Sequence, residues 1–150
     1  MPTKYRGADL ELKTLNAFIN LMRAANSLEL RISRRLSKYG LTISQFGVLE
    51  ALYHLGSMSQ KELGDKILKS GGNITKVIDN LEIKKLIKRK RDINDRRLYI
   101  IDLTGEGRNL IGNIFPQQVS ELVKEFSVLN ESELEKLRRL ARYIGKLKRD

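Results

Sequence analysis

Apolar residues recur every three or four positions along most of this chain, a spacing that is typical of amphipathic helices. The first such stretch covers residues 10–38, and Gly40 ends it. A second begins at Thr42, whose spacing to Gln45 matches a capping box, and a shorter one begins in the same way at Ser59. The pattern predicts one long helix followed by two short helices.

A fourth helix is expected to follow, with Ser70 as its N-cap. Its apolar side would face a core through four residues: Ile74, Val77, Ile78 and Leu81. The opposite side carries small or polar residues: Gly72, Asn73, Lys76, Asp79 and Asn80. The amide and ammonium groups on such a face can bind bases or phosphates, and Gly72 would let a partner come close to the backbone.

The pattern changes after Leu86, because residues 86–91 and 98–103 are two short runs that favour extended structure. The β-branched Ile residues and Tyr99 in these runs are typical of strands. The linking residues 92–97 are mostly charged. We therefore predict a two-stranded hairpin with a charged tip.

Two further helices are predicted after the hairpin. Thr104 can cap a long one, which Pro116 should kink or divide because its ring displaces a helix carbonyl. Asn130 and Glu133 again have the spacing of a capping box. The helix that follows them carries an apolar stripe to the end of the chain: Leu134, Leu137, Ala141, Ile144 and Leu147.

Charge adds a candidate binding surface to this helical pattern. The 150 residues include 29 Lys and Arg against 18 Asp and Glu, which gives a formal net charge of +11. Residues 71–97 hold 9 basic and 4 acidic residues, and residues 1–40 hold 8 and 3, whereas residues 98–150 hold 9 and 8. Charge concentrated in this way favours a polyanionic partner.

Composition excludes several kinds of chemistry. The chain has no Cys and a single His, His54, so it offers no thiolate nucleophile, disulfide or Cys-based zinc site, and no metal or cofactor is expected. No convincing acid–base pair or phosphate-cradling loop is present, so we do not expect an enzyme. Because no apolar run approaches about 20 residues and the first residues lack an apolar signal core, we expect a cytoplasmic protein.

Three short helices followed by a basic hairpin predict a mainly α fold with a small β-hairpin wing, that is, a winged helix-turn-helix core flanked by helices. In such a protein the helix after Ser70 enters the major groove of double-stranded DNA, and the hairpin reaches the adjacent minor groove or backbone. A narrow minor groove concentrates negative potential, which suits a wing Arg. We therefore expect a sequence-specific DNA-binding protein.

The residues at these positions resemble the MarR family of bacterial and archaeal transcription regulators. The resemblance is carried by three motifs in the same order as in the family: residues 41–49, residues 74–82, and the wing with the residues that follow it. The third motif contains Asp92, Asp95-Arg96-Arg97 and Leu103-Thr104-x-x-Gly107. It covers roughly residues 10–148. One departure is Lys85, which stands where the family commonly has Gly, and a left-handed turn there costs Lys more than Gly.

The resemblance implies a homodimer whose first and last helices interlock, acting as a repressor on a pseudopalindromic operator. Residues 1–40 and 105–150 would then supply dimerisation helices, and residues 41–104 the winged helix-turn-helix domain. It also implies release from DNA by a small aromatic or lipophilic anion that enters a cleft between the DNA-binding core and the dimer helices. No residue is assigned to that ligand.

The candidate DNA-binding residues come from the polar helix face and the wing. On the helix they are Ser70, Gly72, Asn73, Thr75, Lys76 and Asn80, and on the wing they are Lys88, Arg91, Asn94, Arg96 and Arg97. By resemblance, one wing Arg enters the minor groove, Arg97 before Arg96, and Asp95 stabilises the wing tip by pairing with an Arg. Two other interpretations stay open: a winged-helix module that binds protein rather than DNA, and a basic amphipathic surface that lies on a membrane.

Overall fold

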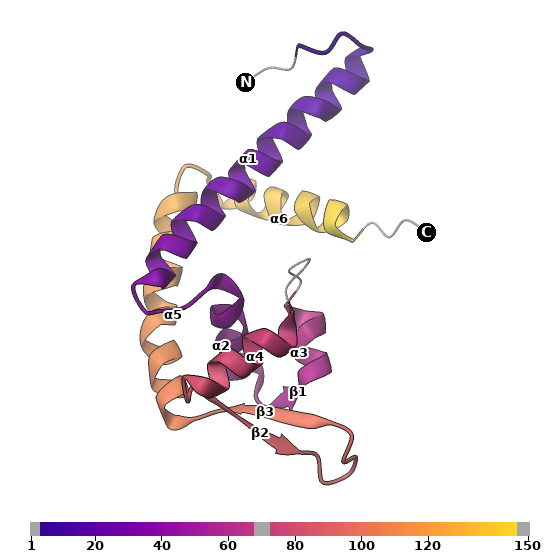
Figure 1. The fold of residues 1–150 in the computed structure, drawn as a ribbon. Coiled ribbons are helices and arrows are strands. Elements are labelled where there is room, and N and C mark those ends of the chain that lie inside the picture. The colour runs from indigo at the N-terminus through magenta and orange to yellow at the C-terminus, as the bar shows by residue number, and fades with distance from the viewer. Residues whose placement is uncertain (1–3, 68–72, 147–150) are drawn as a thin grey trace. The chain divides into compact units, whose positions relative to one another are not determined.

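The computed structural model describes residues 4–67 and 73–146 of the chain. The chain forms two compact units, Met1–Arg108 and Asn109–Asp150. The first four predicted helices and the hairpin all lie within the first unit (Figure 1). The predicted division into dimerisation and DNA-binding segments, at residues 40 and 104, is a functional boundary and stays a prediction.

The four helices of the first unit lie close to their predicted positions: α1 (Asp9–Ser37), α2 (Ile43–Leu55), α3 (Gln60–Lys66) and α4 (Ile74–Ile83). Local caps explain where they begin and end. The Gln45 N–H donates to Thr42 Oγ1 and the Thr42 N–H donates to Gln45 Oε1, both at 3.1 Å, so the predicted capping box opens α2. Gly40 follows α1 with a φ of +69°, a conformation that Gly adopts without strain.

The predicted cap of α4 was wrong, because the N-cap is Asn73 and not Ser70. The Asn73 side chain accepts hydrogen bonds from the backbone N–H groups of Thr75 and Lys76, which have no carbonyl partner within the first turn. Asn and Ser cap helices about equally well, so residue type alone does not distinguish them. Ser70 and Gly72, two of the candidate site residues, lie outside the described residues.

The sheet has three strands where the sequence pattern predicted two. β2 (Ile87–Arg91) and β3 (Tyr99–Leu103) form the predicted antiparallel hairpin, with Ile87 opposite Leu103. β1 (Met58–Ser59) pairs with the other edge of β3, so the strand order is β1-β3-β2. A strand of two residues is too short to show an alternating pattern, which is why the sequence does not reveal it.

A small apolar core lies among α2, α3, α4 and the sheet. Its fully buried side chains come from these elements and from the end of α1: Leu36, Val48, Leu49, Leu52, Leu63, Ile78, Leu81, Ile87 and Ile101. Ile78 and Leu81 confirm the predicted inner side of α4, while Ile74 and Val77 are half-buried. The opposite side of α4 is left for solvent or a partner.

The end of α4, the hairpin and the start of the next helix meet at one backbone junction. Lys85 has a φ of +60°, so the left-handed turn exists here without the usual Gly. The Leu86 carbonyl accepts a hydrogen bond from the Thr104 N–H at 3.1 Å, and Thr104 Oγ1 donates to the Lys85 carbonyl at 2.7 Å. A Cβ at Gly107 would collide with the Leu86 carbonyl oxygen, so this position requires Gly.

The last two helices begin where they were predicted. α5 (Gly105–Phe126) continues through Pro116, which therefore does not divide it. α6 (Glu131–Gly145) opens with the predicted capping box, in which the Glu133 N–H donates to Asn130 Oδ1 at 2.8 Å. Every residue of α6 is exposed, including Leu134, Leu137, Ala141 and Ile144 of the predicted apolar stripe, whereas Leu147 lies outside the described residues.

Lys85→Gly should raise the free energy of unfolding by about 0.5–1 kcal/mol. A left-handed backbone costs an L-residue roughly 1–2 kcal/mol, and Gly avoids this cost. Part of the gain is offset because Gly loses more conformational entropy than Lys on folding. Urea unfolding followed by circular dichroism measures the change. Lys85→Ala is the control, since it removes the same side chain and keeps the strained backbone. A Gly variant no more stable than the Ala variant would contradict strain at this turn.

Candidate nucleic-acid interface

α4 and the hairpin lie side by side in the first unit, and Figure 1 shows the hairpin extending away from α4 to a free tip. On α4, the candidates Asn73, Thr75 and Lys76 are exposed, and Asn80 is half-buried. Lys76 makes no ion pair with the described residues. The outer side of α4 therefore presents a positive charge that no carboxylate of the described chain neutralises.

Two of these candidates also hold α4 in place. Asn73 Oδ1 caps the helix, which leaves the two donors of its amide group for a partner. Thr75 Oγ1 accepts a hydrogen bond from Gln60 Nε2 at 2.8 Å, so it ties the first turn of α4 to α3. A substitution at either position will change the helix as well as any contact with DNA.

The wing tip is held in shape by two aspartates. The Asn94 N–H donates to Asp92 Oδ1 at 3.0 Å, and the Arg97 N–H donates to Asp95 Oδ1 at 3.0 Å. The Arg97 guanidinium also pairs with Asp95, with Nε 3.1 Å from Oδ1 and Nη2 3.3 Å from Oδ2. These hydrogen bonds from Arg97 hold the pKa of the Asp95 carboxyl below its ordinary value. The arginine expected to pair with Asp95 is therefore Arg97.

The other two arginines of the wing tip differ in their surroundings. The Arg91 guanidinium lies 5.3 Å from the centroid of the Tyr99 ring, and its Nη1 donates to the Arg96 carbonyl at 3.2 Å. The Arg96 side chain is exposed and makes no hydrogen bond or ion pair with the described residues. Arg91 therefore stabilises the wing through its contacts with Tyr99 and the Arg96 carbonyl, while the Arg96 side chain is available to a partner.

The structure does not bring Lys88 together with these residues. Successive side chains of a strand point to opposite faces, so Ile87, Arg89 and Arg91 share one face of β2 and Lys88 and Lys90 share the other. Ile87 is buried in the core, which places Lys88 on the outer face of the wing. Lys88 and Arg91 are close in the sequence, but the pleat of the strand places their side chains on opposite faces of β2.

Arg89 is not among the predicted site residues, yet it joins the wing to α4. Its Nη2 pairs with Asp79 Oδ1, and its Nε lies 3.6 Å from Glu82 Oε2. Lys84 also acts within the unit, since its Nζ donates to Gln45 Oε1 at 3.2 Å. The only sequence signal for Arg89 is Asp79 itself, an acidic residue on a face expected to meet phosphates.

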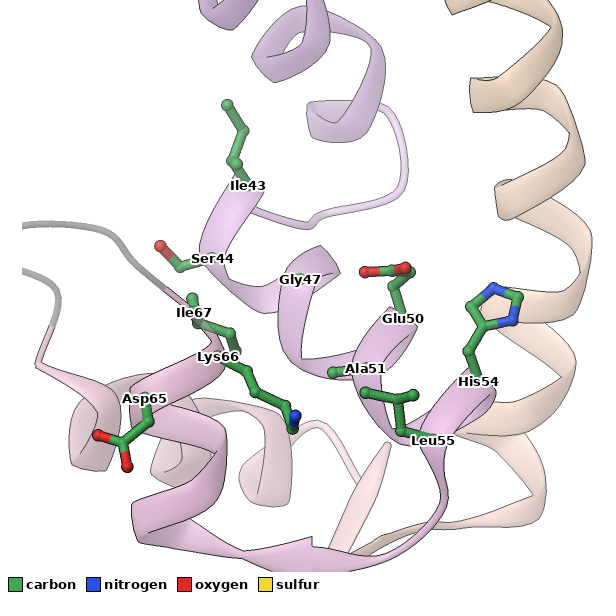
Figure 2. Close-up of a pocket in the computed structure, with 10 residues that line it drawn as sticks. All are labelled: Ile43, Ser44, Gly47, Glu50, Ala51, His54, Leu55, Asp65, Lys66 and Ile67. Carbon is green, nitrogen blue, oxygen red and sulfur yellow. The ribbon is translucent and has the colours of Figure 1, made fainter. Parts of the chain in front are cut away.

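A pocket of about 480 Å³ lies between α2 and the end of α3 (Figure 2). Its charged or titratable lining residues are Glu50, His54, Asp65 and Lys66. Figure 2 shows the Lys66 side chain extending toward α2, while the Asp65 carboxylate points away from it. Two carboxylates oppose one ammonium and one imidazole in this lining, so the pocket offers no clear preference for an anion, and we assign no ligand to it.

The part of the chain that the structure describes contains no group of three or more His, Cys, Asp or Glu side chains placed to hold a metal ion. Among these same residues, none of the helices has both the length and the apolar character needed to cross a membrane.

A polar recognition helix beside a cationic hairpin defines the winged helix-turn-helix class of DNA-binding proteins. Comparison with known proteins identifies the family. The family model of the SarA/Rot transcriptional regulators matches residues 31–114. The HTH-type transcriptional regulator MhqR of Bacillus subtilis is 39% identical over 133 residues, which are 89% of this chain and 92% of that protein. The chain belongs to the MarR family of winged-helix transcriptional regulators, and it is a DNA-binding regulator and not an enzyme.

Solved structures agree with this assignment. Bordetella bronchiseptica BpsR, studied for the regulation of its DNA binding by 6-hydroxynicotinic acid, has a TM-score of 0.76 at 27% identity and covers 86% of this chain and 93% of its own. Staphylococcus aureus MepR in complex with DNA has a TM-score of 0.72 at 27% identity, over 87% and 98%. AbsC of Streptomyces coelicolor, a MarR family regulator, shares the fold at 20% identity with a TM-score of 0.83, over 95% and 97%.

Asn73→Ala should lower the free energy of unfolding by about 1 kcal/mol, because it removes the side chain that caps α4. Asn73→Ser keeps a capping oxygen and loses the amide, so its stability should stay close to that of the wild type. Urea unfolding of both variants measures the cap, and an Ala variant as stable as the wild type would rule it out. DNA binding by the Ser variant then isolates the amide: weaker binding at unchanged stability indicates that Asn73 also contacts DNA.

Proposed function

We propose that this regulator is a cytoplasmic, homodimeric repressor that binds a pseudopalindromic operator. α4 enters the major groove, and the wing tip enters the adjacent minor groove. The observation that carries the proposal is the arrangement of the first unit, where the exposed polar side of α4 lies beside a hairpin with exposed arginines at its tip. The similarity to MepR, whose structure contains DNA, supports the same mode of binding.

Exposed apolar side chains support the dimer. α1 exposes Leu10, Phe18, Met22 and Leu30, and α6 exposes Leu134, Leu137, Leu140, Tyr143 and Ile144. Removing such surface from water is favourable by roughly 25 cal/mol per Å², which gives two copies a reason to associate. A two-fold axis would present two α4 helices to one side of the DNA, about one helical turn apart.

Within the wing, Arg97 is the residue we assign to the minor groove. Its side chain is 89% exposed, although Asp95 holds two of its guanidinium nitrogens. An arginine that is already ordered loses less conformational freedom when it binds, so Asp95 preorganises it. Arg96, which lacks such a partner among the described residues, is assigned to the DNA backbone.

Arg97→Ala and Asp95→Ala should both weaken operator binding, each by about tenfold, because one removes the groove contact and the other its support. The Asp95 result is diagnostic, since removing a negative charge alone would strengthen binding to a polyanion. Arg96→Ala is the matched control, and its loss should be similar for operator and unrelated DNA. Fluorescence anisotropy at fixed salt gives the affinities. Tighter binding by Asp95→Ala would contradict the proposal that Asp95 preorganises Arg97.

The operator and the dimer can be tested in one experiment. DNA selected from a random pool by the purified protein should contain two inverted half-sites whose centres lie about 10 base pairs, or a multiple, apart. Lys76→Ala should relax the preference at one position of each half-site, because Lys76 lies on the exposed side of α4 that we assign to the major groove. A selected sequence without two-fold symmetry would argue against the dimer.

Release by a small aromatic or lipophilic anion completes the proposal, and the regulation of BpsR by 6-hydroxynicotinic acid supports it. That compound and a panel of other aromatic carboxylates and phenolates should include at least one that raises the Kd for operator DNA by about tenfold, a coupling of ordinary size for allostery. Acetate at equal ionic strength is the control. If no compound of the panel raises the Kd, the proposed release by an anion is wrong, and the proposed binding to operator DNA is unaffected.

A further inference from the structure

We propose that Arg89 is a positioning residue for DNA binding, which acts by holding the Asp79 and Glu82 carboxylates of α4 toward the wing. The inference rests on the proposed function, in which α4 and the wing bind one DNA molecule together. Arg89 itself lies on the inner face of β2 and is not required to touch DNA.

The Arg89 guanidinium lies close to two carboxylates of α4 at once. It lies in the middle of β2, opposite Ile101, whose side chain is fully buried. Only 20% of the Arg89 side chain is exposed, against 50% for Asp79 and 46% for Glu82. Nη2 pairs with Asp79 Oδ1 while Nε lies 3.6 Å from Glu82 Oε2. Because Arg89 is partly shielded from water, solvent and salt screen these pairs less than ion pairs between fully exposed groups.

The positions of the Asp79 and Glu82 carboxylates explain why DNA binding requires them to be held. Asp79 belongs to the outer side of α4 together with Lys76 and Asn80, so it would approach DNA along with them. A free carboxylate there would repel phosphates and could rotate toward them. Asp79 and Glu82 are three residues apart and therefore lie on one side of the helix, where a single planar guanidinium can reach both. Arg89 turns both carboxylates toward the wing.

The same contact orients the wing. The backbone joins α4 to β2 through the turn at Lys85 and Leu86, at one end of the strand. The Arg89 pairs add a side-chain connection, from within the strand to the body of α4, to the packing of Ile87 and Ile101 in the core. This added connection resists a tilt of the strand relative to α4. The distance between the helix in the major groove and the wing in the minor groove then varies less.

A double-mutant cycle tests this role. Arg89→Gln is made in the wild-type chain and in the Asp79→Asn/Glu82→Gln chain, and operator affinity is measured by anisotropy for all four proteins. In the wild-type chain the substitution should weaken binding by about tenfold, because both carboxylates are released. In the amide chain it should weaken binding by less than about threefold, since no carboxylate remains to be held. Wild-type binding in the same titration tests the proposed function separately.

Equal losses in the two chains would overturn the proposal, because an arginine that contacts phosphate, adds one positive charge or only fills space acts independently of the carboxylates. Lys90→Gln is the matched control, since it removes a cation from the outer face of the same strand, and its loss should be equal in both chains. Thermal melts confirm that each variant is folded. If Arg89→Gln does not fold, Arg89→Lys replaces it in the cycle, and its loss must still be larger in the wild-type chain.

Discussion

The hydrogen-bonded junction around the Leu86 carbonyl is the constraint on which the arrangement of α4 and the wing depends. This oxygen accepts the Thr104 N–H and leaves no room for a side chain at Gly107, while the Leu86 N–H donates to the Leu81 carbonyl at 3.0 Å. The junction therefore ends α4, starts β2, ends β3 and caps α5. Because the wing leaves α4 here, the left-handed turn at Lys85 sets the direction in which the wing projects.

The formal charge of +11 does not act as one surface. Lys84 and Arg91 make contacts inside the first unit, and Arg89 neutralises carboxylates of α4. Lys76 and Arg96 remain exposed without a described ionic partner. A cation that is paired within the protein contributes to the shape of the binding surface more than to its field, so the charge available to DNA is smaller than the sum over the sequence.

The predictions that succeeded concern interactions between residues close in the chain. The Thr42 and Asn130 boxes join residues three apart, and the apolar side of α4 follows from helical spacing alone. The prediction of Ser70 as the cap failed because an equally suitable Asn stood three residues later. β1 escaped notice because it exists only by pairing with β3, whose partner residues lie more than forty positions away.

The sequence by itself determined the helices, the hairpin, the concentration of basic residues and the motifs that resemble the MarR family. Each of these depends on residue type and on spacings of a few residues, which the chain carries whatever its tertiary fold. Only the tertiary structure decided which basic residues are exposed and which make contacts within the chain. Arg89 meets Asp79 and Lys88 points outward because α4 packs against one face of the sheet, and that choice of face depends on contacts between distant parts of the chain.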